Sequence, residues 1–326
     1  MNKLVKEVLT NKVKINYYFK VLTYIKFWLE KTAYKKKGSC YIYIFLAFVF
    51  MLSINSCELY NPSEPIPAYI QIDKINLNTT ISTEGSSSNK ISDAWVYLDD
   101  QLIGCFELPA KFPVLFEGKH QIKIMPGIKV NGIAATRAPY PFYSSYDTLI
   151  NLQVGTIQNI TPHVKYRTNI TFNFMENFEN TGTIISKSPA PGVDTVIQQI
   201  DAPNPNVFEG NGSGIVYLDK NHTFFEGVSS TSFILPKSGA DIFLEFNYKC
   251  NNTFVVGLFA HGTASSSKEA ALIFNPSANW NKAYVYLTSV VSRNNNASDF
   301  NIFFGMINNT SSDSLALLLD NIKLVY

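Results

Sequence analysis

Residues Leu315–Val325 read LALLLDNIKLV, a run in which aliphatic side chains hold most positions and a single acidic residue, Asp320, interrupts them. A strand that is apolar on both faces is typical of a sheet that is covered on both sides or lines a groove. The stretch therefore predicts a buried β-strand and an all-β fold around it.

The preceding segments carry the same kind of signal. Strands rich in β-branched or aromatic residues are predicted at Asp241–Lys249, Phe254–Ala260, Ala270–Phe274, Ala283–Val291 and Phe300–Ile307. Clusters of Asn, Ser and Gly separate them, and no helical stretch of useful length stands out. We therefore predict that residues 169–326 form one β-sandwich domain.

Upstream, residues 68–166 show apolar side chains at a period of two. Strands are predicted at Tyr69–Asp73, Ala94–Leu98, Leu102–Leu108, His120–Ile124, Leu149–Val154 and His163–Tyr166. Asp99-Asp100-Gln101 is read as a turn, and Pro109–Pro113 as a break in the strand pattern. This spacing of short strands predicts a first, smaller β-sandwich domain.

The loop Pro126–Tyr146 carries Arg137 and a group of aromatic rings. Exposed aromatic rings beside an arginine can form a binding patch. We favour the simpler interpretation, in which the rings pack under the loop or against the second domain.

The N-terminal stretch Tyr41–Cys57 reads YIYIFLAFVFMLSINSC and follows three lysines at 35–37. Its apolar run has the length of a signal-peptide core. The ending Ile54-Asn55-Ser56-Cys57 resembles a bacterial lipobox, which implies lipidation of Cys57 and an outer membrane lipoprotein, periplasmic or surface-exposed. Residues 1–56 are then leader and signal peptide, and 57–67 a tether; a plain secretory signal or a single-pass anchor is the alternative.

Charge argues against nucleic acid as a partner. The chain has 27 Lys+Arg and 25 Asp+Glu, and residues 1–56 hold ten lysines and two glutamates. That leaves 17 basic and 23 acidic residues after the leader, a net charge near −6. Nucleic-acid binding needs a basic footprint, which this body lacks. Cys105 and Cys250 are expected to be two separate buried thiols rather than a bridge.

Two family resemblances follow from the order of these features. The strand, Asp-Asp turn, strand and Gly118-Lys-His order resembles small β-sandwich modules of the PEGA or carboxypeptidase-regulatory type, which implies an immunoglobulin-like spacer. The second part resembles the galactose-binding-like jelly-roll of carbohydrate-binding modules. That resemblance rests on Phe174–Asn180, Gly210–Leu218, Leu244–Tyr248, Trp280 with the strand after it, and Leu319–Leu324.

The jelly-roll resemblance implies two kinds of site. A structural calcium often joins the first and last strands of that family, and the matching carboxylates here are Glu176, Glu179 and Asp320; calcium favours such hard oxygen ligands. Glycan ligands stack on aromatic rings while polar side chains bind their hydroxyls. The candidate ligand-binding residues are Trp280, Tyr284, Tyr286, His222, Phe224 and His261. In the strand Ala283–Val291, alternation places Tyr284 and Tyr286 on one side, and Ala283, Val285 and Leu287 on the other.

No catalytic constellation is evident in the sequence. The four histidines, His120, His163, His222 and His261, show no metal-ligand spacing, and neither HExxH nor G-x-S-x-G occurs. We therefore predict a non-enzymatic, lipid-anchored envelope protein that binds carbohydrate through its jelly-roll. The alternatives are a structural or assembly lipoprotein that binds another envelope protein and, third, a glycan hydrolase with paired carboxylates.

Overall fold

The computed structural model describes residues 20–26, 43–48, 64–263, 266–310 and 312–326. The chain divides into two compact units, Met1–Pro65 and Ile66–Tyr326. In the first unit, residues 20–26 and 43–48 are helical. Among the described residues, no helix is both long and apolar enough to cross a membrane. Cys57 lies outside the described residues, so the lipobox stays a prediction.

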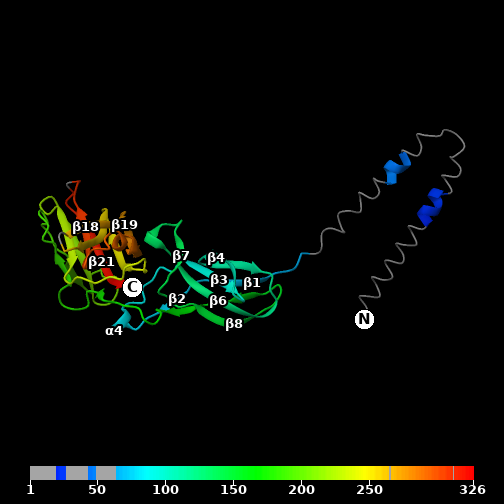
Figure 1. The fold of residues 1–326 in the computed structure, drawn as a ribbon, viewed down its shortest axis with the longest axis horizontal. Helices are drawn as coiled ribbons and strands as arrows, with labels where there is room; N and C mark the ends of the chain where they lie inside the picture. The colour runs from blue at the N-terminus through cyan, green and yellow to red at the C-terminus, as the bar shows by residue number, and fades with distance from the viewer. Residues whose placement is uncertain (1–19, 27–42, 49–63, 264–265, 311) are drawn as a thin grey trace. The chain divides into compact units, whose positions relative to one another are not determined.

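The second unit is built almost wholly of strands (Figure 1), which confirms the predicted fold class. Its N-terminal elements are β1 (Ala68–Ile72), β2 (Asn76–Asn78), α4 (Ile81–Glu84), β3 (Asp93–Leu98), β4 (Gln101–Glu107), β5 (Ala110–Val114), β6 (Gly118–Lys129), η1 (Val130–Gly132), β7 (Arg137–Pro139), β8 (Tyr146–Leu152), β9 (Ile157–Asn159) and β10 (His163–Lys165). We call the strands among them the N-terminal sheets.

The N-terminal sheets run in the orders β5-β1-β9, β10-β2 and β4-β3-β6-β7, with β8 also paired to β6. Alternate residues of β1, β3 and β6 point into a shared core, as the period of two predicts. The predicted turn between β3 and β4 is confirmed, because Asp99 and Asp100 both adopt positive φ, at 49° and 63°. Such left-handed residues fit the twist of a tight hairpin.

The predicted break at Pro109–Pro113 is confirmed at Pro109, which lies between β4 and β5, and is wrong beyond it, because β5 runs through Pro113 and pairs with β1 along its whole length. β5 is the edge of its sheet. Proline lacks a backbone donor, which an edge strand tolerates on its open side.

The C-terminal elements form two larger sheets. They are β11 (Phe174–Glu176), β12 (Ile185–Lys187), β13 (Gln198–Asp201), β14 (Gly212–Leu218), β15 (Phe224–Ser229), β16 (Phe243–Cys250), β17 (Phe254–His261), β18 (Ser266–Phe274), β19 (Ser277–Tyr286), α5 (Thr288–Arg293), β20 (Asp299–Ile307) and β21 (Leu315–Val325). One sheet has the order β13-β14-β21-β16-β19, with β11 on β21, and the other has β12-β15-β20-β17-β18. We call them the β21 sheet and the β20 sheet; their facing sides enclose the main core.

A β-bulge in β21 changes which of its side chains point to each face of the sheet. Asn247 pairs with Asp320 and Glu245 with Lys323, so β21 has one residue more than β16 over this interval. Asn321 takes a positive φ of 49° there. The extra residue shifts the alternation. Leu319 and Ile322 therefore both join the core. Asp320 and Lys323 belong to the opposite side, which we call the outer face of the β21 sheet.

The predicted strand Ala283–Val291 is too long. β19 ends at Tyr286, and Thr288–Arg293 forms the short helix α5. Val290 and Val291 are buried in the core from this helix, so packing outweighs their preference for strands. Phe224, one of the candidate ligand-binding residues, begins β15.

The two described cysteines are free thiols, as predicted, but only Cys250 is buried. Cys105 is exposed on β4, so the expectation of a buried thiol there is wrong. Cys105 lies on the outward face of β4, which is exposed.

The rings of the Pro126–Tyr146 loop pack inward, which confirms the simpler interpretation. Tyr140 and Tyr143 are buried, and the Tyr140 ring lies 5.1 Å from that of Phe243 and 5.0 Å from that of Tyr284. Phe243, Tyr284 and Val325 of the β21 sheet therefore share the core of the N-terminal sheets. The division of residues 68–326 into two domains at residues 166–169 stays a prediction. The residues before and after this point share one buried hydrophobic cluster.

Candidate functional site

The outer face of the β21 sheet carries a row of buried polar groups under the N-terminal sheets. Glu245 on β16 lies between Tyr284 on β19 and Lys323 on β21. Tyr140 donates a 2.7 Å hydrogen bond to the Glu245 carboxylate, and Tyr166 donates to both of its oxygens at 3.0 Å. These bonds stabilise a carboxylate with no solvent exposure. They hold two segments on the sheet, Pro126–Tyr146 through Tyr140 and the residues after β10 through Tyr166.

The next row along the same face is less well satisfied. Lys282, Asn247 and Asp320 are successive cross-strand neighbours, and Ser213 on β14 donates a 2.6 Å bond to Asp320. All four are buried. The Asn247 Oδ1 and Lys282 Nζ atoms have no hydrogen-bond partner among the described residues, although Lys282 Nζ lies 3.5 Å from a Glu245 oxygen. Buried polar atoms without partners are costly, so this row needs an explanation.

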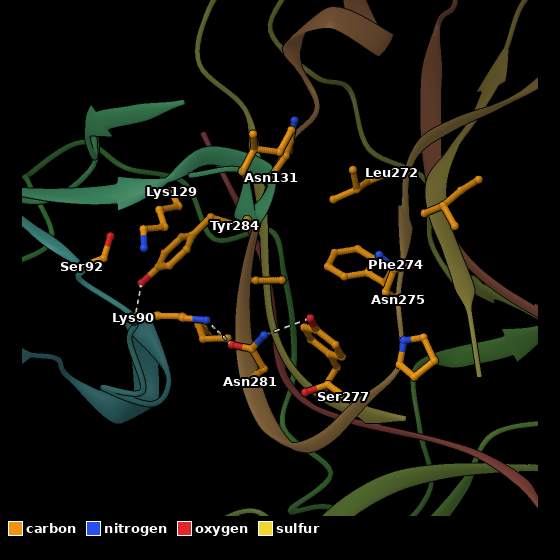
Figure 2. Close-up of a pocket in the computed structure, with 17 residues that line it drawn as sticks. Lys90, Ser92, Lys129, Asn131, Leu272, Phe274, Asn275, Ser277, Asn281 and Tyr284 are labelled. Atoms are coloured by element: carbon orange, nitrogen blue, oxygen red, sulfur yellow. Dashed lines mark hydrogen bonds between the residues drawn. The ribbon is translucent and has the colours of Figure 1, made fainter. Parts of the chain in front are cut away.

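A pocket of about 410 Å³ opens at the β19 end of this row (Figure 2), and we call it the Lys90 pocket. It is lined from the N-terminal part by Lys90, Ser92, Lys129, Asn131, Gly132 and Ile133, and from the C-terminal part by Tyr248, Leu272, Ile273, Phe274, Asn275, Pro276, Ser277, Asn281, Lys282, Ala283 and Tyr284. The volume lies within the range of small-molecule sites. Neither part alone supplies all of its walls.

A chain of hydrogen bonds runs along one wall of the Lys90 pocket. Figure 2 shows Lys90 pointing to Asn281, and its Nζ donates a 2.6 Å bond to the Asn281 Oδ1. The Asn281 amide donates in turn to the Tyr248 hydroxyl at 3.0 Å. The backbone N–H of Lys90 donates to the Tyr284 hydroxyl, also at 3.0 Å. These bonds hold an amide, an ammonium group and two phenols in one arrangement.

The opposite wall depends on a tight turn at the end of β6. Asn131 adopts a positive φ of 56° and Gly132 one of 70°, conformations that Asn and Gly tolerate best. This geometry lets Asn131 Oδ1 accept a 2.8 Å bond from the backbone N–H of Tyr286 on edge strand β19. The turn thereby fixes the N-terminal wall of the pocket against the sheet.

The lining of the Lys90 pocket includes three lysines and no acidic residue. Lys129 is paired outside the lining with Glu107, at 2.9 Å. Partial burial and then the nearby charge of Lys129 lower the pKa of Lys90. Burial also lowers the pKa of Lys282, against the opposing charge of Glu245. The site is therefore positively charged and rich in donors.

A second pocket, of about 680 Å³, lies where Asp320 ends the same row, and we call it the Asp320 pocket. Its lining includes Glu179, Glu209 and Asp320, with Asn and Ser side chains and no cation. Burial raises the pKa of Asp320 to about 7, which hydrogen bonds from Ser213 and from the Asn321 backbone oppose and the charge of Glu209 reinforces. The two pockets thus differ in charge.

The three aromatic candidates on β19 are separated by the structure. Tyr284 lines the Lys90 pocket, while Tyr286 lies in a smaller pocket with Arg137. Trp280 packs on Phe208 at a ring distance of 5.1 Å, and its buried Nε1 has no hydrogen-bond partner among the residues that the structure describes. The predicted alternation of Tyr284 and Tyr286 against Ala283 and Val285 agrees with the membership of the two cores.

The other three candidates do not join the Lys90 pocket. His222 is exposed and contacts Asp219, and Phe224 is half-buried on β15. His261 ends β17 on the β20 sheet and contacts the Asn301 side chain at 2.7 Å. These residues line none of the pockets described above, and their role in binding stays a prediction.

The proposed calcium ligands are engaged by protein donors. Glu176 accepts from the backbone N–H groups of Phe178 and Ile184, and Glu179 from that of Asn211. Glu179 and Asp320 share the Asp320 pocket, but Glu176 does not line it. Within the described ranges, no three His, Cys, Asp or Glu side chains are placed to hold a metal. As they lie, these residues do not fit a calcium site, and calcium stays an untested prediction.

Lys90, Asn281 and Tyr248 are the pocket residues that sequence reasoning missed. Lys90 lies between two predicted strands, Tyr69–Asp73 and Ala94–Leu98, and Tyr248 was assigned to the strand Asp241–Lys249. A local signal existed in the two asparagines flanking Trp280, which are unusual within a strand. Nothing in the sequence joins residue 90 to residue 281.

The sequence matches no protein-family model and no curated protein. Several solved structures are similar. The CBM22-1 and GH10 modules of an endo-1,4-beta-D-xylanase from Clostridium thermocellum align with a TM-score of 0.34 and 12% identity, over 47% of this chain and 28% of that chain. The CBM22-2 xylan-binding domain from Paenibacillus barcinonensis aligns with a TM-score of 0.34 and 13% identity, over 46% and 97%.

A cleaved adhesin domain of Lys-gingipain from Porphyromonas gingivalis is a third similar structure. It aligns with a TM-score of 0.35 and 17% identity, over 47% of this chain and 97% of that chain. All three TM-scores are below 0.5, so a ligand of this chain has to be inferred from its own side chains.

Proposed function

We propose that this protein binds carbohydrate, without catalysis, in the Lys90 pocket. The observation that carries the proposal is the hydrogen-bonded wall of Lys90, Asn281 and Tyr248, beside the apolar side chains of Leu272 and Phe274. A sugar presents hydroxyls at its rim and C–H groups on its faces. Fixed polar groups facing an apolar wall match both.

The lining also supports binding rather than hydrolysis. Glycoside hydrolysis uses two carboxyl groups on either side of the scissile bond. The lining of the Lys90 pocket contains neither carboxylates nor histidine, so it offers no acid and base pair.

A glycan array probed with the full-length protein tests this function. We expect binding that falls at least about tenfold in Asn281→Ala, since that change removes the amide between Lys90 and Tyr248. Tyr248→Phe, which removes one hydroxyl, is expected to weaken binding less. Asn151→Ala, an exposed position on β8, is the matched control. An array without signal from a folded protein would instead favour an envelope-protein partner.

We further propose that Cys57 carries a lipid that holds the protein at the outer membrane, facing the periplasm or the outside. The proposal rests on the lipobox-like ending of the apolar stretch. Metabolic labelling with a fatty acid, followed by mass spectrometry, tests it. Label on wild type and none on Cys57→Ser supports the anchor, and unlabelled wild-type protein overturns it.

A further inference from the structure

We infer that the Lys90 pocket selects an acidic sugar unit, with the carboxylate of a uronic acid beside Lys90. This inference rests on the proposed function and names the ligand class of that same site. It follows from the charges and the unused hydrogen-bond donors of the lining.

The charge of Lys90 is the one left without a counter-ion. Of the three lysines in the lining, Lys129 is paired with Glu107 at 2.9 Å, and Lys282 lies 3.5 Å from Glu245. Lys90 has no carboxylate within ion-pair distance in the described chain, and its only side-chain partner is the neutral Asn281 oxygen. A bound anion would compensate this ammonium group.

Two more side chains in the lining, Tyr248 and Asn131, have hydrogen-bond donors to spare. The Tyr248 hydroxyl accepts from Asn281, while its own proton has no acceptor among the described residues. Asn131 uses its Oδ1 for the Tyr286 N–H, which leaves its amide hydrogens unbonded within the described ranges. A carboxylate is an acceptor-only group with two oxygens, so it matches this set better than a hydroxyl does.

Asn281 also brings two of these donors together. Its amide binds Lys90 through the oxygen and Tyr248 through the nitrogen, so the ammonium group and the phenol lie on either side of one planar group. A carboxylate in the pocket can accept from both. The Asp320 pocket, with three carboxylates in its lining, would repel the same ligand.

The test compares one sugar chain with and without its charge. Calorimetry on the full-length protein measures binding of oligogalacturonate and of its fully methyl-esterified form. We expect the acid form to bind about five- to tenfold more tightly, and its binding to weaken as salt rises from about 0.05 M to about 0.5 M. Equal affinity for the two forms would overturn the inference.

Lys90→Gln removes the charge but keeps a donor for Asn281. We expect the acid form to lose more affinity than the ester, so that the preference for the acid form falls below about twofold. Lys119→Gln, an exposed lysine on β6 away from the pocket, should keep the preference. A preference that survives Lys90→Gln contradicts the assignment.

The outcomes separate this inference from the broader function. Neutral glycans that bind in an Asn281-dependent way, with no gain from a carboxylate, would leave the carbohydrate site standing and remove its acidic specificity. No binding of any glycan would overturn both.

Discussion

The Lys90 pocket and the Asp320 pocket lie at two points of one row on the same sheet, yet their charges are opposite. Lys282 lines the first, Asp320 lines the second, and Asn247 pairs with both. The carboxylates of the Asp320 pocket all come from the C-terminal sandwich. Two of the three lysines of the Lys90 pocket, Lys90 and Lys129, come from the N-terminal part.

The difference shows that the N-terminal part contributes directly to a pocket, beyond the spacer role that its family resemblance implied. Its turn at Asn131 and its segment at Lys90 build one wall of a pocket and supply its positive charge. The same part covers the row at Glu245 with Tyr140 and Tyr166. Substitutions at Glu245, Asp320, Asn247 and Glu209 test this contrast between the pockets.

The largest effect is expected at Glu245, the carboxylate that joins the two parts. Glu245→Leu removes the acceptor of Tyr140 and Tyr166 and leaves Lys282 without its nearby charge. We expect the free energy of unfolding to fall by about 3–5 kcal/mol, measured by urea denaturation. Glu117→Ala, an exposed carboxylate, should change it by less than about 0.5 kcal/mol. A small loss at Glu245 would mean that the covering of the sheet does not depend on this group.

The second-largest effect is expected in the pH dependence of stability, through Asp320. The unfolded chain releases the Asp320 proton near pH 4, whereas the folded protein keeps it up to a pKa of about 7. The contribution of this group to stability is therefore lost as pH rises from about 4 to 7, and stays lost above. Asp320→Asn should be more stable than wild type at pH 8, by about 2–4 kcal/mol, and similar to it near pH 4.

Urea denaturation of both proteins across this range measures the difference. A stability difference that does not change with pH would show that Asp320 is not held protonated by its surroundings. Glu117→Gln, at an exposed carboxylate, serves as the control and should track wild type at every pH.

A smaller change in the free energy of unfolding is expected at Asn247, which lies between the two pockets. Most core substitutions lower this free energy, whereas this one should not. Asn247 Oδ1 has no hydrogen-bond partner in the described part of the chain, so Asn247→Leu should leave the free energy of unfolding unchanged or raise it by up to about 1 kcal/mol. Ser213→Ala in the same row breaks a bond to Asp320 and should lower it by about 1 kcal/mol. A large loss in Asn247→Leu would show that its side chain is satisfied in solution.

The smallest effect tests whether the pockets act separately. Glu209→Gln, in the Asp320 pocket, should change glycan binding in the Lys90 pocket by less than about twofold, because Glu209 is exposed and does not line that pocket. Calorimetry with the same oligosaccharide measures it. A larger change would join the two pockets into one site.

The strands were the part of this molecule most open to sequence reasoning. Residues 243–250, 254–261, 299–307 and 315–325 are strands where alternation and composition placed them. The errors at Pro113 and at residues 288–293 share a cause. A proline is tolerated in an edge strand, and valines can be buried from a helix as well as from a strand. Each case depends on neighbouring elements, which a local sequence pattern does not show.

The site was harder to predict for the same reason. Strand alternation placed Tyr284 on one face of a strand as a candidate ligand-binding residue, and this residue does line the Lys90 pocket. Its companions Trp280 and Tyr286 share that alternation, but they pack against the rings of Phe208 and Phe243 and do not line the Lys90 pocket. Alternation assigns a side chain to a face, while the use of that face depends on what packs over it.

The sequence by itself determined that this chain is built of strands, which of their faces are apolar, and that its body is not basic, because these follow from local pattern and composition. Only the tertiary structure decided that Lys90 meets Asn281 and that Tyr140 meets Glu245. Those contacts join residues more than a hundred positions apart, and their geometry depends on the bulge in β21, the turn at Asn131 and the packing of two cores. The physical reason is that a pocket is made of surfaces from several elements, and no single stretch of sequence contains it.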